Sequence, residues 1–297
     1  MTQTVGIVGI GIMGTAMTRN LRQSGFEVVG YDPVPAACSR LLEMGGRPLA
    51  SPREVVAAAP ITLMSLPNAE ALTQAIASVV QAEGGGQIVV ECSTLPLDVK
   101  QAAYLAMERS GKILLDCPVS GTGAQAVSKD LVILGSGDER AFASCAEVFA
   151  AMSRSQRYLG PFGRGSMMKY IANHLVTIHN VAAAEAMLLG IKAGLDPAVV
   201  YDTLADSAGT SRMFQLRGAL MRDQSYDQPT ATIRMHRKDI SIIDGFAASL
   251  ACALPVYAAA SQLYHAGAAL GFAEQDTAAV CAVLETMHGL DRKKSAS

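Results

Sequence analysis

A glycine-rich turn near the start of the chain is the feature that most constrains its fold. The apolar run from Val5 to Val8 leads into Gly9-Ile10-Gly11-Ile12-Met13-Gly14, and apolar residues at helical spacing follow. A second apolar run, from Phe26 to Tyr31, ends at Asp32. In such a unit the first glycine permits a tight turn, the second a close approach to a pyrophosphate, and the third close helix–strand packing. This context favours a dinucleotide-binding unit over an ordinary glycine loop.

The turn and the acid after the second strand together predict the cofactor. Backbone N–H groups at the start of the helix would bind the phosphates, so the whole turn, Gly9, Ile10, Gly11, Ile12, Met13 and Gly14, is a predicted cofactor site. The Asp32 carboxylate could accept hydrogen bonds from the ribose hydroxyls of NAD, and it would repel the 2′-phosphate of NADP. No arginine follows Asp32 directly. We therefore expect NAD rather than NADP, although Asp32 could also be a turn residue before Pro33.

Strands and helices alternate through the rest of the first half. Further strands are predicted at Ile61–Ser65, Ile88–Cys92, Ile113–Asp116, Leu131–Leu134 and Tyr158–Leu159. The alternation predicts an α/β Rossmann-type domain with a doubly wound, mostly parallel sheet. Ligands bind beyond the carboxyl ends of such strands. Polar segments at those ends are therefore candidate ligand contacts: Ser65-Leu66-Pro67, Ser93-Thr94 and Ser120-Gly121-Thr122-Gly123.

The strand pattern stops after Gly160-Pro161, and the second half is predicted to be all helical. One helix of about 30 residues, at about 164–193, would join a domain of residues 1–162 to a domain of residues 163–297. Shorter helices are expected around residues 197–206, 212–221, 235–252, 255–271 and 275–288. On the long helix Lys169 and Asn173 are four residues apart and share one face. A lysine there could be functional, or it could extend its ammonium group into solvent from a surface position.

Charge and cysteine content exclude several classes of function. A net charge of −2 gives no electrostatic basis for binding nucleic acid or an anionic membrane. No apolar run of about 18 residues lacks polar interruptions, so no membrane span is expected. The six cysteines show no zinc spacing, which indicates free thiols and a cytoplasmic protein. The first residues are predicted to be a strand and not a signal peptide. His174 and His179 are poorly spaced for metal ligands, so no metal site is expected.

Four separated motifs together resemble the β-hydroxyacid dehydrogenase family, which includes 3-hydroxyisobutyrate dehydrogenase and tartronate semialdehyde reductase. GIVGIGIMGTAM resembles the family's cofactor fingerprint, and DCPVSGTG at 116–123 resembles its substrate-binding motif. GRGSMMKYIAN at 163–173 resembles the catalytic motif, and HRKDI at 236–240 resembles a C-terminal Lys-Asp motif. The resemblance covers nearly the whole chain. It implies a C-terminal domain like that of 6-phosphogluconate dehydrogenase and a homodimer or homotetramer.

The resemblance implies a role for each matching residue. Lys169 occupies the position of the catalytic lysine, which would take the proton of the substrate hydroxyl as hydride leaves for the nicotinamide. Asn173 would orient the substrate. Lys238 would close over the cofactor, although a basic cluster of this kind is usually a solvated surface. The remaining residues follow by position: Ser120, Gly121, Thr122 and Gly123 would bind the carboxylate of a small 3-hydroxy acid, and Ser65, Leu66, Pro67 and Thr94 would contact NAD.

Two positions depart from the family pattern and leave the substrate open. Thr122 stands where the family usually has a second glycine, and Ala172 stands where it often has a first asparagine. The substrate could resemble hydroxyisobutyrate, glycerate or threonate, and the physiological direction is not fixed by the sequence. Three other functions compete: an imine or semialdehyde reductase using NADPH, a non-catalytic dinucleotide-binding module, and a small-molecule methyltransferase. Lys169 argues against the imine reductases, which generally lack a lysine at its position.

Overall fold

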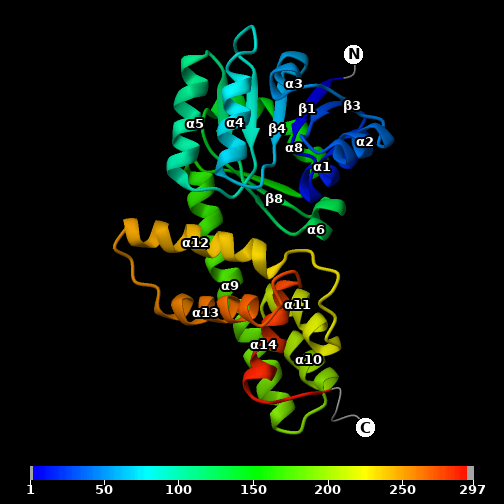
Figure 1. The fold of residues 1–297 in the computed structure, drawn as a ribbon, viewed down its shortest axis with the longest axis vertical. Helices are drawn as coiled ribbons and strands as arrows, with labels where there is room; N and C mark the ends of the chain where they lie inside the picture. Colours follow the sequence, from blue (N-terminus) through cyan, green and yellow to red (C-terminus); the bar gives the residue numbers. More distant parts are fainter. Residues whose placement is uncertain (1–2, 293–297) are drawn as a thin grey trace. The chain divides into compact units, whose positions relative to one another are not determined.

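Six parallel strands form the main sheet of the first of two units (Figure 1). The computed structural model describes residues 3–292, with one unit ending at Lys169 and the other beginning at Tyr170. The strands run in the order β3-β2-β1-β4-β5-β6. Their bounds are β1 (Thr4–Val8), β2 (Glu27–Tyr31), β3 (Arg47–Pro48), β4 (Ile61–Met64), β5 (Ile88–Glu91) and β6 (Ile113–Asp116). The order reverses between β1 and β4, so this edge is where a doubly wound sheet binds ligands.

Helices cover both faces of this sheet because its strands are apolar on both sides. Neighbouring residues of β5, Val89 and Val90, lie in two different cores. The core on one face includes residues of α1 (Ile12–Gln23), α2 (Pro35–Glu43), α6 (Gly123–Val127), α7 (Glu139–Ser144) and α8 (Ala146–Met152). The core on the other face includes residues of α3 (Pro52–Ala58), α4 (Ala69–Val79) and α5 (Leu97–Arg109). The predicted Rossmann-type domain is confirmed.

The last strands of the first unit leave the main sheet and form a second one. β7 (Val119–Ser120) pairs antiparallel with β8 (Val132–Gly135), and β9 (Ser155–Tyr158) pairs parallel with β8. The sequence predicts β8, but it places the last strand at Tyr158–Leu159, which shares only Tyr158 with β9. It predicts neither the separate sheet nor β7. The peptide groups of Asp116 and Ser136 bond to each other in both directions, and this bridge joins β6 to the segment after β8.

The second unit is built from helices, as predicted. α9 (Arg164–Lys192) begins in the first unit and continues into the second, followed by α10 (Pro197–Ala205), α11 (Arg212–Asp223), α12 (Ile233–Ser249), α13 (Pro255–Ala269) and α14 (Val280–Met287). α12 and α13 lie side by side in Figure 1. Tyr170, Ala184 and Met187 of α9 lie in the core of this unit with Ile240 and Tyr264. The side chain of Asp196 caps α10 by accepting from the N–H of Ala198.

α9 is long and apolar enough to cross a membrane, by length and composition alone. The core helices of water-soluble proteins pass the same test. Its polar side chains Asn173, Thr177 and Asn180 are buried and hydrogen-bonded to residues of the second unit. These partners mark α9 as a core helix of that unit.

Candidate active site

The glycine turn after β1 has the geometry of a phosphate-binding turn. Gly9 adopts a φ of +90°, and a Cβ there would overlap the carbonyl oxygen of Ser65. A Cβ on Gly14 would overlap the carbonyl oxygen of Gly9, so α1 packs against the turn only because residue 14 is glycine. Apart from the adjoining residues of the chain, no described residue has an atom within 4 Å of the position that a Cβ on Gly11 would take. α1 also has no side-chain cap and no acid in its first turn, which leaves its N–H groups for an anion.

Asp32 fixes this turn in place. One carboxylate oxygen accepts from the Ile10 N–H at 2.7 Å, and the other accepts from the Val34 N–H at 2.9 Å. A carboxylate has about four lone-pair sites, so two remain for ribose hydroxyls. Arg40 donates to the Ile10 carbonyl oxygen at 3.1 Å, which places a cation beside the turn. The sequence places Arg40 eight residues beyond Asp32, and only the packing of α2 reveals this position.

The loops after β4 and β5 join the turn at the same edge of the sheet. The Ser65 N–H donates to the carbonyl oxygen of Val8, the last residue of β1. The Leu66 N–H donates to the Ser93 hydroxyl at 2.8 Å, and Thr94 follows directly. The structure therefore brings the predicted cofactor residues Ser65, Leu66, Pro67 and Thr94 to the edge that holds the glycine turn. Their role as cofactor contacts stays a prediction.

The segment from Ser120 to Gly123 ends β7 and begins α6. Gly121 has a φ of +140°, and a Cβ there would overlap the Leu131 side chain. The Thr122 N–H donates to the Gln125 side-chain oxygen at 3.0 Å, and the Thr122 hydroxyl accepts from the Gln125 N–H. This capping box already supplies an acceptor for the Thr122 N–H. Of the predicted carboxylate contacts, Ser120 and the N–H groups of Gly121 and Gly123 are not used by this box.

Lys169 lies on the first turns of α9 and is about nine-tenths buried. The helix start is held by Asp116, which accepts from the Ser166 N–H at 2.8 Å and from the Ser166 hydroxyl at 2.7 Å. Lys169 follows Ser166 by three residues, so the two side chains project from one side of the helix. The structure thus gives the predicted catalytic lysine a buried position on a fixed helix turn.

The second unit holds Asn173 and the Lys-Asp motif together. The Asn173 amide donates to Asp239 at 2.8 Å, and the Lys238 ammonium lies 3.2 Å from the other Asp239 oxygen. Asn173 is buried, whereas the Lys238 side chain is about 40% exposed. Since only the amide nitrogen can donate to a carboxylate, Asp239 fixes the orientation of the Asn173 side chain. Asp239 therefore orients a predicted substrate-binding residue.

The histidines near these motifs have structural partners. His236 is buried, bonds to the Thr177 hydroxyl at 2.8 Å and lies against the Tyr264 ring. His174 stacks on Tyr257, with ring centroids 5.2 Å apart. Burial, together with the charge of His179, lowers the pKa of His174.

Three buried charges were not predicted from the sequence. The Lys100 ammonium lies 2.5 Å from Glu91 and 2.8 Å from Asp116, and all three side chains are inaccessible to solvent. Burial alone would lower the pKa of Lys100, but the neighbouring carboxylates of Asp116 and Glu91 outweigh it and raise the pKa. Burial likewise raises the pKa of the adjacent Cys92 thiol. One feature of the sequence could have indicated this cluster: the otherwise apolar strands β5 and β6 each end in an acidic residue.

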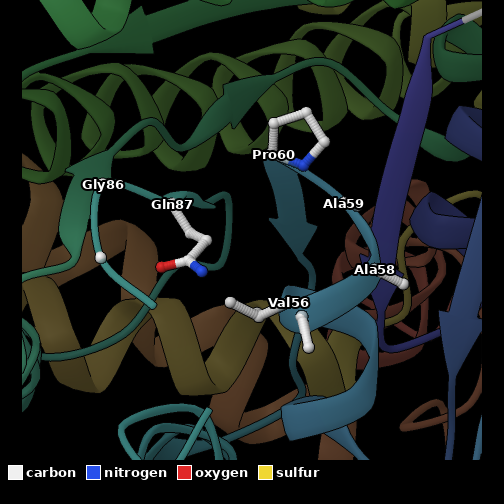
Figure 2. Close-up of a pocket in the computed structure, with 8 residues that line it drawn as sticks. Val56, Ala58, Ala59, Pro60, Gly86 and Gln87 are labelled. Carbon is white, nitrogen blue, oxygen red and sulfur yellow. The ribbon is translucent and has the colours of Figure 1, made fainter. Parts of the chain in front are cut away.

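One surface hollow lies at the opposite edge of the main sheet (Figure 2). Its volume is about 290 Å³, and its lining includes Val56, Pro60, Gly86 and Gln87. Pro60 and Gln87 directly precede β4 and β5, so the hollow faces the amino ends of the strands. Ligands of doubly wound sheets bind at the carboxyl ends, and the hollow is therefore not the candidate site.

Comparison with known proteins agrees with this geometry. Residues 4–160 match the model of the NAD-binding domain of 6-phosphogluconate dehydrogenase. Residues 163–284 match the model described as NAD-binding of NADP-dependent 3-hydroxyisobutyrate dehydrogenase. The first match includes the glycine turn, and the second includes α9.

Individual relatives match along almost their full length. An L-threonate dehydrogenase from Cupriavidus necator is 32% identical over 94% of this chain and 95% of its own. A 2-hydroxy-3-oxopropionate reductase from Escherichia coli is 30% identical over 95% of this chain and 97% of its own. The crystal structure of a 3-hydroxyisobutyrate dehydrogenase from Salmonella typhimurium aligns with a TM-score of 0.86 at 30% identity, covering 95% of this chain and 99% of that one.

Proposed function

Because the chain belongs to the β-hydroxyacid dehydrogenase family, we propose that it oxidises a small 3-hydroxy acid with NAD as hydride acceptor. The family assignment makes it an oxidoreductase that acts on CH–OH groups. The observation that carries the finer proposal is Lys169, a buried amine on a helix turn that Asp116 holds in place.

The residues of the first unit fit a nicotinamide dinucleotide. The open space over Gly11 and the uncapped start of α1 would receive the pyrophosphate. Asp32 would accept the adenosine ribose hydroxyls through its two remaining lone-pair sites. Its negative charge favours NAD over NADP, while Arg40 beside it is the residue that could attract a 2′-phosphate.

Lys169 would act as the general acid–base. Oxidation removes a hydride from the carbinol carbon and a proton from its oxygen, and NAD when bound would supply the hydride acceptor. The neutral Lys169 amine would take the proton, and in the reverse direction its ammonium form would return it to the carbonyl oxygen. A free lysine has a pKa of about 10.4, so such a base needs an environment that favours the neutral form. The Lys169 side chain is buried, and desolvation by burial is one of the effects that favour the neutral form of an amine.

The substrate would be held by its carboxylate and by its hydroxyl. Ser120 and the N–H groups of Gly121 and Gly123 would bind the carboxylate, and Asn173, oriented by Asp239, would bind near the hydroxyl. The Thr122 N–H is occupied by Gln125, so one donor fewer than the sequence argument expects remains for the carboxylate. Similar proteins are named for threonate, 2-hydroxy-3-oxopropionate and 3-hydroxyisobutyrate, which share a short hydroxy- or oxo-carboxylate.

The proposal is tested by NADH formation with a panel of 3-hydroxy acids, including hydroxyisobutyrate, glycerate, threonate and serine, run in parallel with NADP. Lys169→Ala should lower kcat by about a thousandfold, the scale of general acid–base catalysis, while the Kd for NAD stays within about threefold. Lys192→Ala, at the exposed end of the same helix, is the control and should keep full activity. Turnover in Lys169→Ala near that of the control would remove Lys169 from the mechanism. Tight NAD binding without turnover of any substrate would favour the non-catalytic module.

We also propose a cytoplasmic homodimer or homotetramer. All six cysteines are unpaired, which suits a reducing compartment. α9 exposes Ile171, Leu175 and Leu189, and covering such apolar side chains is a common reason for association. Light scattering of the purified protein would give the number of subunits, and a monomer at micromolar concentration would contradict this proposal.

A further inference from the structure

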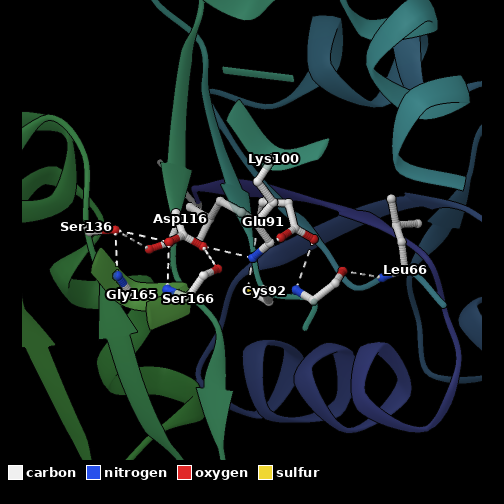
Figure 3. Close-up of polar contacts among 10 residues, drawn as sticks. Leu66, Glu91, Cys92, Lys100, Asp116, Ser136, Gly165 and Ser166 are labelled. Atoms are coloured by element: carbon white, nitrogen blue, oxygen red, sulfur yellow. Dashed lines mark hydrogen bonds and ion pairs between the residues drawn. The ribbon is translucent and has the colours of Figure 1, made fainter. Parts of the chain in front are cut away.

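A cluster of three charged side chains lies in the first unit, next to the candidate site. None of the three was predicted from the sequence as a site residue. Glu91 ends β5, Asp116 ends β6, and Lys100 reaches both from α5; we refer to these three residues as the Lys100 cluster (Figure 3). All three side chains are fully buried. Two carboxylates and one ammonium leave a formal charge of −1, which is costly to bury unless other donors compensate it.

The compensating donors on one side come from the start of α9. Ser166 gives Asp116 two hydrogen bonds, one from its N–H and one from its hydroxyl. The Ser136 hydroxyl donates to Asp116 at 3.2 Å and accepts from the Gly165 N–H at 2.9 Å. A Cβ on Gly165 would overlap the carbonyl oxygens of Leu134 and Asp116, so the helix start also fits tightly against the backbone. Asp116 thereby fixes the turn that precedes Lys169.

The donors on the other side come from the predicted cofactor loops. Glu91 accepts from the Ser93 N–H at 2.9 Å, and the Ser93 hydroxyl accepts from the Leu66 N–H at 2.8 Å. Ser93 precedes Thr94, and Leu66 is one of the predicted cofactor contacts. One unbroken set of hydrogen bonds and ion pairs therefore runs from Leu66 through the Lys100 cluster to Ser166 (Figure 3).

We propose that Lys100 is a positioning residue, which holds the helix turn of Lys169 in register with the loops after β4 and β5. The inference rests on the proposed function, because Lys169 is taken there as the acid–base group. A buried ion cluster often contributes no more stability than apolar packing of the same volume, so fixed geometry is the property that it adds. Hydride and proton must leave neighbouring atoms, and misplacement by about 1 Å can cost about a hundredfold in rate.

Charge-matched variants test this role. Lys100→Met leaves two unpaired carboxylates, and we expect kcat to fall about a hundredfold while KM and the Kd for NAD change less than about threefold. Adding Glu91→Gln to this variant restores the wild-type formal charge of −1. Asp116 then keeps its bonds from Ser166, and kcat should recover at least about tenfold. Lys112→Met is the matched control, because Lys112 is a buried lysine that donates to the carbonyl oxygens of Ala82 and Gly84.

Two results would overturn the inference. One is a folded Lys100→Met variant with kcat within about threefold of wild type. The other is an equal loss of kcat in Lys112→Met, which would indicate a merely structural effect. Should Lys100→Met fail to fold, Ser166→Ala decides the question, since it removes one hydrogen bond of the same network. A tenfold loss of kcat in that variant supports the inference, and unchanged kcat overturns it.

A second readout does not need a substrate. Competitive acetylation followed by mass spectrometry measures how fast Lys169 reacts relative to the exposed Lys192. Loosening the first turn of α9 should raise the relative rate at Lys169 at least threefold in Lys100→Met or Ser166→Ala, and not in Lys112→Met. An unchanged rate would overturn the inference. If the wild-type protein turns over no hydroxy acid, the proposed function fails, and the acetylation result still decides whether Lys100 positions Lys169.

Discussion

At the scale of single residues, Asp32 has a structural role in the glycine turn, and the proposed function adds a role in recognition. It accepts two backbone N–H groups, which hold the glycine turn, and its remaining lone-pair sites are the ones proposed to bind the ribose hydroxyls. The Arg40 guanidinium donates to the carbonyl oxygen of Ile10, so a positive charge also lies beside the turn. The proposed preference for NAD therefore depends on one acid and one base that both bond to the backbone of Ile10.

Asp32→Asn should shift this balance towards NADP. The amide has one acceptor oxygen instead of two, so one backbone N–H loses its partner and unfolding free energy falls by about 1 kcal/mol. Without the negative charge, Arg40 can attract a 2′-phosphate, and the ratio of kcat/KM for NAD over NADP should fall at least about tenfold. Glu27→Gln, which changes an exposed acid at the start of the strand before Asp32, should leave the ratio unchanged. A ratio that does not move would show that Asp32 has no part in selection.

The sequence predicts residues that belong to contiguous motifs and misses those that meet only in space. Lys169, Asn173 and the glycine turn are recognisable because their neighbours in the chain define them. Lys100 is not, because its partners Glu91 and Asp116 lie on different strands and meet only through the register of β5 and β6. Likewise, the sequence contains Gln125 but does not say that it occupies the Thr122 N–H.

At the scale of elements, the contact between α9 and α13 includes a histidine whose protonation is disfavoured in the folded protein. His174 of α9 stacks on Tyr257 of α13, and burial followed by the charge of His179 lowers the pKa of His174. The unfolded chain has the ordinary histidine pKa of about 6.5, so near that pH it binds more protons than the folded protein. Stability from this contact is therefore present above pH 6.5 and is lost as the pH falls below it.

Acidification from pH 7.5 to pH 5 should thus lower the urea midpoint of unfolding more steeply in wild type than in His174→Gln. All other titrating groups are the same in the two proteins, so the difference between the two pH profiles comes from His174. Val256→Gln, at an exposed position next to Tyr257, adds no titratable group and should keep the wild-type pH dependence. Parallel profiles for wild type and His174→Gln would contradict this assignment.

Most elements follow from local patterns, and the exceptions are informative. α9 to α13 begin and end within three residues of their predicted bounds, because periodicity and capping residues define them. The last predicted helix, 275–288, is in the structure a 3-10 turn (Thr277–Ala279) followed by α14, which begins at Val280. β3 and β7 have two residues each and are too short to produce a pattern. The division of the strands into two sheets depends on pairing between distant segments, which no local pattern encodes.

At the scale of the whole molecule, the reactivity of each cysteine depends on how deeply it is buried within its unit. Cys92, Cys117 and Cys145 are buried in the first unit and Cys281 in the second, whereas Cys252 is exposed and Cys38 partly so. Burial raises the pKa of Cys145 to about 12 and that of Cys281 to about 12. Since the thiolate is the reactive form, buried thiols are protected by both inaccessibility and protonation.

Native protein treated with iodoacetamide at pH 8 should therefore react first at Cys252 and then at Cys38. The four buried thiols should react only after addition of urea, as peptide mass mapping over time would show. Cys252→Ser should remove the fastest phase and leave the others unchanged. Reaction of Cys92 or Cys117 at the rate of Cys252 would mean that the sheet of the first unit opens readily.

The hydrogen bonds of Asp116 also determine where this polypeptide can be cut or recombined. A fragment that stops at residue 160, where the first family match ends, retains Asp116 but loses the Gly165 and Ser166 groups that complete its network. Water would then enter at a carboxylate that is dry in the intact chain. A chimera that exchanges the helical half with that of a relative is best joined after Lys169, so that the first turn of α9 travels with the sheet that anchors it.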